Sequence, residues 1–215
     1  MNKKSADFLS FLNKTFPNAH CELNFHDDFS CLVAIMLSAQ TTDKSVNRVT
    51  PSLWAKFPSV YELSNSSVEE IQPLIASLGM SKTKARNLLE LSKIIVKDYF
   101  GIVPTEKELL LSLPGIGIKT TNVFLAERYK VPAIPVDTHI SRISIRLKYA
   151  KEGTRPSEIE KILEKNFPKE EYIPLHHKII FFGRSICLAR NPKCSECEMQ
   201  KYCKDYKIYV SKIDK

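Results

Sequence analysis

The stretch LPGIGIKTT, residues 113–121, places a proline and two glycines just ahead of a lysine. It is not a P-loop, because that motif needs glycine directly before the lysine and Ile118 stands there. It is not a dinucleotide-binding fingerprint, because Thr120 occupies the position of the third glycine. Helical runs at residues 106–112 and 119–128 flank the stretch, so it predicts two helices joined by a tight turn.

Such a turn has a chemical use. Glycine and proline leave the backbone N–H groups of the turn without obstruction by side chains. The second helix adds its own unpaired N–H groups and the positive end of its dipole. Together these groups bind a phosphate without reading a base sequence. A plain helix–helix turn has the same composition, and the residues of the turn alone favour that simpler interpretation.

Most of the remaining chain also has helical periodicity. Several segments show apolar residues three and four apart, at residues 5–16, 29–39, 43–57 and 82–100. No segment has a convincing strand pattern, and VPAIPV at 131–136 predicts an extended connector because it holds two prolines. The sequence therefore predicts an all-α fold.

Three helix starts carry recognisable signals. Thr105 with Glu108, and Ser157 with Glu160, have the spacing of capping boxes ahead of apolar runs. Asp137 precedes another helical run, and an N-cap is the ordinary role of an aspartate at such a position.

Composition limits the class of protein. The chain has 215 residues, enough for one good core or two small ones, and 43% of them are hydrophobic. It shows no apolar run near 18 residues and no secretion signal, which indicates a cytoplasmic protein that does not enter a membrane. Residues 101–215 hold 21 Lys and Arg against 14 Asp and Glu, out of a net charge of +8. This excess suits a nucleic acid partner, although charge alone fits a merely basic surface equally well.

Four cysteines crowd into 17 residues near the C-terminus: Cys187, Cys194, Cys197 and Cys203. In a reducing cytosol such a group indicates a metal site rather than disulfides. Only the pair C-x2-C has the spacing of a zinc knuckle, and the intervals match neither common ferredoxin pattern. Spacing alone slightly favours zinc.

Three motifs in order carry a family resemblance: LPGIGIKT, then VPAIPVDTHI, then C-x6-C-x2-C-x5-C. With ELNF (22–25) and LSAQTTD (37–43), the chain resembles the endonuclease III family, the base-excision-repair DNA glycosylases of the helix–hairpin–helix superfamily. The resemblance implies two helical lobes with a DNA-binding cleft between them. One lobe would span residues 22–131, with the helix–hairpin–helix at about 106–128. The other would join residues 1–21 to 132–215 and hold the cysteines at 187–203.

The resemblance also implies roles for particular residues. Lys119 matches the nucleophile of the family and Asp137 its catalytic aspartate. The four cysteines match the ligands of one 4Fe–4S cluster. The DNA contacts would come from hairpin glycines, two residues that fill the gap left by a flipped nucleotide, and two basic residues beside the cluster: Gly115, Gly117, Gln40, Met80, Arg190 and Lys193.

Three positions depart from the pattern. Ile118 stands where relatives often have a basic residue, Ser81 replaces a frequent aromatic, and Asn191 lies in a loop that is usually more basic. These departures bear on affinity and lesion preference rather than on the chemistry.

The implied activity is release of oxidised pyrimidines from duplex DNA, followed by strand cleavage through a lysine Schiff base. We expect a nucleoid-associated monomer that acts on double-stranded DNA with damaged bases or abasic sites. Two alternatives remain at this point. A monofunctional adenine glycosylase usually has another residue at the lysine position and an extra C-terminal domain. A non-catalytic DNA-binding module would leave Lys119 and Asp137 without a purpose.

Overall fold

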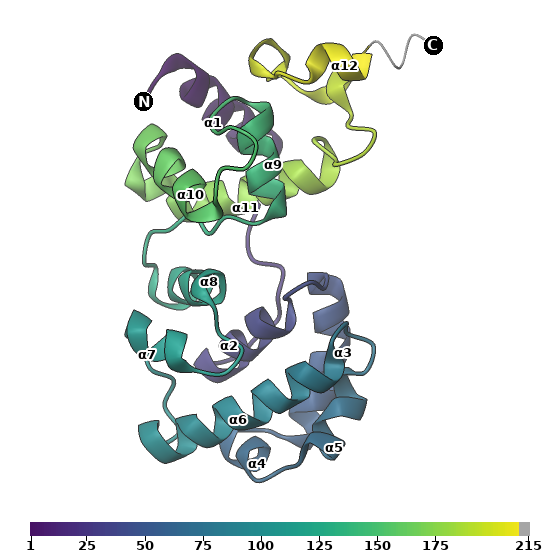
Figure 1. Ribbon diagram of the computed structural model, residues 1–215, viewed down its shortest axis with the longest axis vertical. Coiled ribbons are helices and arrows are strands. Elements are labelled where there is room, and N and C mark those ends of the chain that lie inside the picture. Colours follow the sequence, from purple (N-terminus) through teal and green to yellow (C-terminus); the bar gives the residue numbers. More distant parts are fainter. Residues whose placement is uncertain (211–215) are drawn as a thin grey trace. The chain divides into compact units, whose positions relative to one another are not determined.

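The computed structural model describes residues 1–210, and within them it contains helices and no strand (Figure 1). The predicted all-α fold class is confirmed. No helix among these residues is long and apolar enough to span a bilayer. The elements are α1 (Lys3–Thr15), α2 (Asp28–Leu37), α3 (Asp43–Lys56), α4 (Val60–Ser64), α5 (Val68–Ile71), η1 (Gln72–Ile75), α6 (Ser81–Tyr99), α7 (Lys107–Ser112), α8 (Ile118–Tyr129), α9 (Thr138–Arg146), α10 (Pro156–Asn166), η2 (Lys169–Glu171), α11 (Tyr172–Ser185), η3 (Cys194–Glu196), η4 (Gln200–Tyr202) and α12 (Tyr206–Val210).

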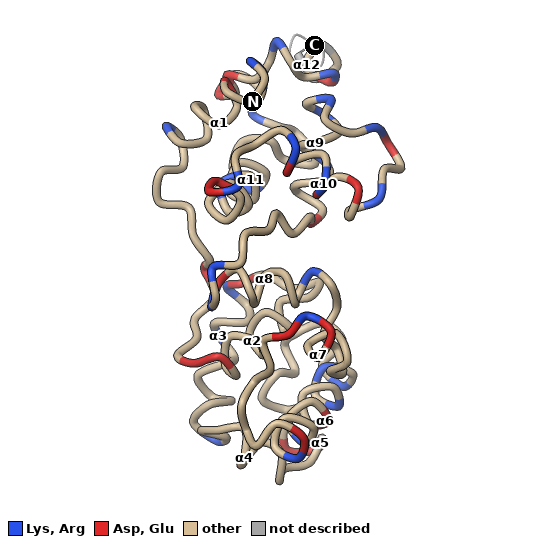
Figure 2. Tube along the Cα trace, turned by 90° about the vertical axis from the view of Figure 1, so that its left-hand side faces the viewer, with Lys and Arg blue, Asp and Glu red and all other residues tan. Residues whose placement is uncertain are grey.

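The chain divides into two compact units. Unit 1 combines Met1–Cys21 with Lys130–Lys215, and unit 2 is the continuous segment Glu22–Tyr129. The charge is divided unequally between them. Unit 1 holds 21 Lys and Arg against 12 Asp and Glu, whereas unit 2 holds 11 against 12 (Figure 2). The basic excess of the protein therefore belongs to unit 1.

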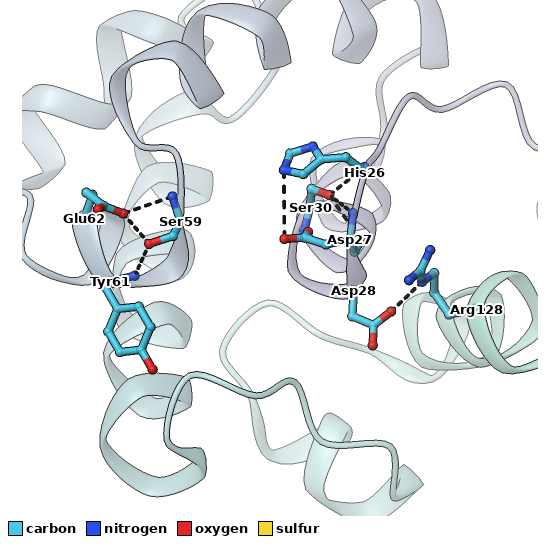
Figure 3. A network of polar contacts seen from close by, with 8 residues as sticks. All are labelled: His26, Asp27, Asp28, Ser30, Ser59, Tyr61, Glu62 and Arg128. Carbon is cyan, nitrogen blue, oxygen red and sulfur yellow. Dashed lines mark hydrogen bonds and ion pairs between the residues drawn. The ribbon is translucent and has the colours of Figure 1, made fainter.

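Unit 2 is built around α2. Every residue of this helix from Phe29 to Leu37 is buried, as expected of a helix that is apolar on all sides. Helices α3 and α8 pack against α2, while α6 packs against α4 and α5. Asp27 begins α2 with a capping box, in which its carboxylate accepts from Ser30 N at 2.7 Å (Figure 3).

Unit 1 joins the two ends of the chain in one core. Helix α1 packs against α11, and α11 packs against α9. Phe8 and Phe11 of α1 both meet Phe182 of α11 edge-on, with ring centroids 5.9 and 5.4 Å apart. All three side chains are buried. The N-terminal helix is therefore a structural part of the C-terminal unit.

The two predicted capping boxes are wrong. Helix α7 begins after Glu106, so Thr105 lies outside it. Helix α10 begins at Pro156, which leaves Ser157 inside the first turn instead of at the cap. Proline at the first helical position fixes the start of α10, because its preset φ suits that position. Besides the Asp27 box, capping boxes are formed by Ser59 with Glu62 (Figure 3) and by Ser67 with Glu70.

Candidate active site and metal centre

Residues 113–117 form the turn predicted between α7 and α8. Leu113 and Ile116 are buried and anchor this turn in the core of unit 2. Gly115 has φ +79°, and a Cβ at this position would lie 2.8 Å from Asn87 Nδ2 and 3.1 Å from Met36 Sδ. The backbone conformation therefore favours glycine there, and a Cβ would also force the side chains of Asn87 and Met36 to shift.

Gly117 has a different environment. A Cβ built at Gly117 meets no atom within 4 Å, and its φ lies outside the left-handed region. The residue is exposed and directly precedes α8. Packing within the protein therefore gives no reason for glycine at this position, and the surface just before α8 is open.

Lys119 lies in the first turn of α8 and is exposed. The N–H groups of a first turn have no carbonyl partner within their helix, and the helix dipole makes this end positive. Ile118 beside it is 59% exposed. The start of α8 thus presents an amine, open backbone donors and one apolar side chain to solvent.

The far end of α8 is tied to α2. Arg128 and Tyr129 both donate hydrogen bonds to the carboxylate of Asp28, the first residue of α2 (Figure 3 shows Arg128). The hydrogen bond to Asp28 is the largest cause, and burial the second, of a pKa of Tyr129 that is raised to about 12. This junction holds the helix that carries Lys119 against the central helix of unit 2.

Asp137 is the N-cap of α9 in unit 1, and that part of the sequence prediction is confirmed. Its Oδ1 accepts from Ile140 N at 2.8 Å, and the residue is partly exposed. Residues 131–136 before it are neither helix nor strand, as predicted, and their buried apolar side chains fix the connector in place. The carboxylate is thus held at the start of a well-anchored helix.

Arg142 connects α9 to the segment that carries the first cysteine. Its Nη2 donates to Gly183 O and Cys187 O, both at 2.9 Å, and lies 3.2 Å from His139 Nδ1. A Cβ on Gly183 would lie 2.9 Å from His139, so α9 and α11 approach closely at this glycine. Burial lowers the pKa of His139. His139 is therefore a packed, hydrogen-bonded residue of the α9–α11 contact.

All four clustered cysteines line one pocket in unit 1. Arg146 lies in its wall, 5% exposed, and donates from Nη1 to Cys187 Sγ at 3.2 Å. The same guanidinium donates to Leu188 O at 2.7 Å and Tyr209 OH at 2.6 Å. A buried cation therefore stands beside the sulfurs.

The four cysteines share one pocket of unit 1. Within residues 1–210, no three His, Cys, Asp or Glu side chains are arranged to hold one metal ion. A tetrahedral zinc site needs its thiolates to converge to about 2.3 Å from one point. Here the cysteines surround a cavity instead, which suits a cluster in which each thiolate binds a different iron. Burial raises the pKa of Cys197 to about 11.

Gln40 and Met80 share an uncommon conformation. Gln40 lies in the turn after α2 with φ +55°, and Met80 is the N-cap of α6 with φ +60°. Both are exposed, Met80 to 57%. Left-handed backbone is uncommon for residues other than glycine, and among the described residues Phe100, Lys130, Lys148 and Asn191 also adopt it. Both turns belong to unit 2.

Arg190 and Lys193 lie in the loop after Cys187, and both are exposed. Lys193 N donates to Ile186 O at 2.9 Å, which closes the loop. The Lys193 ammonium lies 3.8 Å from Glu196, so part of its charge is already balanced. Arg190 is the stronger candidate for binding an external anion.

Known proteins are similar to this chain in sequence and fold. Residues 33–169 match the HhH-GPD superfamily of base excision DNA repair proteins, and residues 187–203 match the iron–sulfur binding domain of endonuclease III. Endonuclease III of Bacillus subtilis (strain 168) is 42% identical over 206 residues, covering 95% of this chain and 94% of that protein. The chain belongs to the endonuclease III family.

Other members of the endonuclease III family agree over the full length. Endonuclease III of Escherichia coli (strain K12) is 36% identical over 215 residues, or 100% of both chains. A solved structure of a trapped endonuclease III–DNA covalent intermediate, an estranged-adenine complex, superposes with a TM-score of 0.91 at 39% identity. The match covers 98% of this chain and 100% of that one. The chain is thus a base-excision repair enzyme, a DNA N-glycosylase and AP lyase.

Family membership also identifies the cofactor. The protein carries one 4Fe–4S cluster, and the matched iron–sulfur domain contains all four clustered cysteines. The resemblance therefore led to the right metal, whereas the slight preference for zinc from spacing alone was wrong. Sequence patterns did not indicate Arg142, Arg146 or Lys84, whose side-chain hydrogen bonds to Cys187 and Leu37 span more than 40 residues.

Proposed function

We propose that this enzyme releases oxidised pyrimidines from duplex DNA and cleaves the strand with Lys119 as nucleophile. The observation that carries the proposal is the start of α8. An exposed primary amine there directly follows an open glycine turn and the positive end of a helix. A phosphate held by the N–H groups of Gly115 and Gly117 would bring a sugar within reach of that amine.

A base inside a duplex is inaccessible, so the damaged nucleotide must rotate out of the stack. We assign Gln40 and Met80 to the gap that it leaves. Their exposure and left-handed turns support this role, because each side chain stands at the tip of a turn rather than along a helix face. Arg190 and Lys193 would contact phosphates, which position the DNA without reading its sequence.

Lys119 would act in three steps. Its neutral amine attacks the sugar C1′, and the bond between C1′ and the base breaks as the base takes up a proton. The nitrogen then loses a proton, and the C1′–O4′ bond breaks as O4′ takes up a proton, which opens the sugar ring and gives a Schiff base. Removal of a C2′ proton then expels the 3′ phosphate by β-elimination. Asp137 would stabilise the positive charge that develops on the sugar, or accept a proton from the lysine.

The four clustered cysteines, Cys187, Cys194, Cys197 and Cys203, would each bind one iron of the cluster. When bound, the cluster would link the segment after α11 to the short helices η3 and η4. It would hold residues 188–193 in shape, so that Arg190 and Lys193 remain available to phosphates. No step of the strand cleavage passes through it. We place the enzyme in the cytoplasm, where its DNA substrate lies in the nucleoid.

Borohydride trapping tests the central step. Reduction converts a Schiff base into a stable amine, so only an enzyme that forms one becomes covalently joined to abasic DNA. The parent should be trapped in a one-to-one complex, and peptide mapping should find the adduct on Lys119. A parent that releases damaged bases without becoming trapped would be a monofunctional glycosylase. A parent that binds DNA without either reaction would be a binding module.

A further inference from the structure

Lys84 is a buried lysine with an unusual set of partners. It lies in the first turn of α6 and is only 6% exposed. Its ammonium donates three hydrogen bonds, to Leu37 O at 2.8 Å, Ala39 O at 2.9 Å and Thr41 Oγ1 at 3.0 Å. These use all three of its donors. Burial lowers the pKa of the Lys84 ammonium. Lysine is almost never fully buried without partners, so the buried ammonium of Lys84 depends on these three hydrogen bonds.

The acceptors surround Gln40. Ala39 and Thr41 are its immediate neighbours in the chain, and Leu37 is the last residue of α2. The turn is otherwise closed by two longer backbone hydrogen bonds, Ala39 N to Met36 O at 3.3 Å and Thr41 N to Ser38 O at 3.1 Å. The ammonium of Lys84 also occupies the negative end of the α2 dipole. It therefore fixes the turn that holds Gln40 in its left-handed conformation.

The backbone of the same lysine is joined to Met80. Lys84 N donates to Met80 O at 2.9 Å, which is the first hydrogen bond of α6. Met80 is the N-cap of that helix and, like Gln40, has a left-handed backbone conformation. Gln40 and Met80 are far apart in sequence. One residue nevertheless contacts both turns, through its side chain on one side and its backbone on the other.

We propose that Lys84 is a positioning residue that holds Gln40 and Met80 in fixed register, so that both enter the gap in the duplex together. This inference rests on the proposed gap-filling role of those two residues. If both residues are already held in place before DNA binds, they lose less conformational freedom on binding than two independently mobile turns would lose. It also explains why a charged group is kept in the interior of unit 2, where an apolar side chain would pack without desolvation.

A lysine that only stabilises the fold would make the same hydrogen bonds as one that positions Gln40 and Met80. The two roles can be distinguished by comparing two DNA substrates. A duplex with an abasic site has a gap to fill, whereas a single-stranded oligonucleotide with the same site has none. If Gln40 and Met80 lose their fixed positions, only cleavage of the duplex should slow. Loss of fold or of chemistry should slow both.

The test uses Lys84→Met, which keeps the apolar stem and removes the charge and the donors. Single-turnover cleavage of the abasic duplex should fall roughly tenfold or more, within the range for a misplaced positioning group. Cleavage of the single strand should stay within about twofold, since its chemistry does not use Lys84. With 2-aminopurine opposite a stable abasic analogue, the parent should raise the fluorescence by unstacking that base, and the variant should not. Lys97→Met, an exposed lysine on the same helix, controls for the lost charge and should match the parent.

Two results would overturn the proposal: equal rates of the variant and the parent on the duplex, or equal loss on both substrates. A parent that cleaves neither substrate would instead refute the proposed function. Should Lys84→Met fail to fold, Thr41→Val decides, because it removes only one of the three acceptors. It should show a smaller loss on the duplex alone, and an unchanged ratio of duplex to single-strand rates would reject the role of Lys84.

Discussion

Gly115 and Gly117 are two residues apart in one turn, yet the structure predicts opposite consequences for replacing them with alanine. At Gly115 the left-handed backbone disfavours any Cβ by about 1–2 kcal/mol. The contacts at 2.8 Å to Asn87 and 3.1 Å to Met36 add overpacking, of about 1 kcal/mol at the low end of the usual range. The stiffer unfolded chain returns about 0.5–1 kcal/mol. Gly115→Ala should therefore destabilise the protein by about 2 kcal/mol.

The expected shift is measurable by calorimetry of the cluster-loaded enzyme. In a protein of this size, about 2 kcal/mol corresponds to a melting temperature lowered by roughly 4–8 °C. Gly117→Ala should leave the melting temperature within about 1 °C, because surface changes away from special backbone positions have little effect on stability. Its Cβ would instead obstruct a phosphate, so it should weaken binding to damaged and undamaged duplexes alike.

The comparison has a clear way to fail. If Gly117→Ala melted as early as Gly115→Ala, the distinction between a packed and an open glycine would be incorrect. If Gly117→Ala bound DNA as tightly as the parent, the open surface before α8 would not be the phosphate site.

The other predictions concern chemistry, binding and the metal. Lys119→Gln should keep its cluster and its affinity for abasic DNA, but lose borohydride trapping and at least about a hundredfold in strand cleavage; parent-like trapping would place the nucleophile elsewhere. Asp137→Asn should slow base release yet retain some trapping on a pre-formed abasic site, and equal loss of both would contradict a role in charge stabilisation. Arg190→Ala should lower the salt dependence of log K by about one unit, and Lys193→Ala by less because Glu196 already balances its charge; an altered lesion choice with an unchanged slope would mean base reading. The purified protein should absorb broadly near about 400 nm through its cluster, and Cys197→Ala should lose this band together with the folding of unit 1; a colourless, active protein with stoichiometric zinc would refute the assignment.

Local sequence patterns predicted the helices well because the signals for a helix lie among residues that are close together in the chain. The apolar periodicity around LPGIG placed α7 and α8 correctly, and the proline-rich connector before Asp137 was also right. The two predictions of capping boxes were wrong, and the reason is also local. Several overlapping start signals compete, and at α10 the proline at 156 fixed the first helical position one residue before the predicted cap.

Long-range features were beyond these patterns. Nothing in the sequence shows that Gln40 and Met80 adopt left-handed backbone, because tertiary contacts impose that conformation. Lys84 reads as one more polar residue on a helix, and only the folded chain brings it to the carbonyls at the end of α2. Cysteine spacing likewise gives the order of the ligands but not the width of the cavity between them. Recognition of the family supplied what spacing could not.

The packing of α1 on α11 has a consequence for biosynthesis. As the chain leaves the ribosome, α1 emerges first, but its buried partners in α11 follow about 170 residues later. Phe8 and Phe11 must therefore stay uncovered while unit 2, which is continuous in sequence, folds from its own residues. The core of unit 1 closes only after α11 has been made. The cysteines come later still, so iron delivery falls at the end of synthesis, after the helices that cover Phe8 and Phe11 have been made.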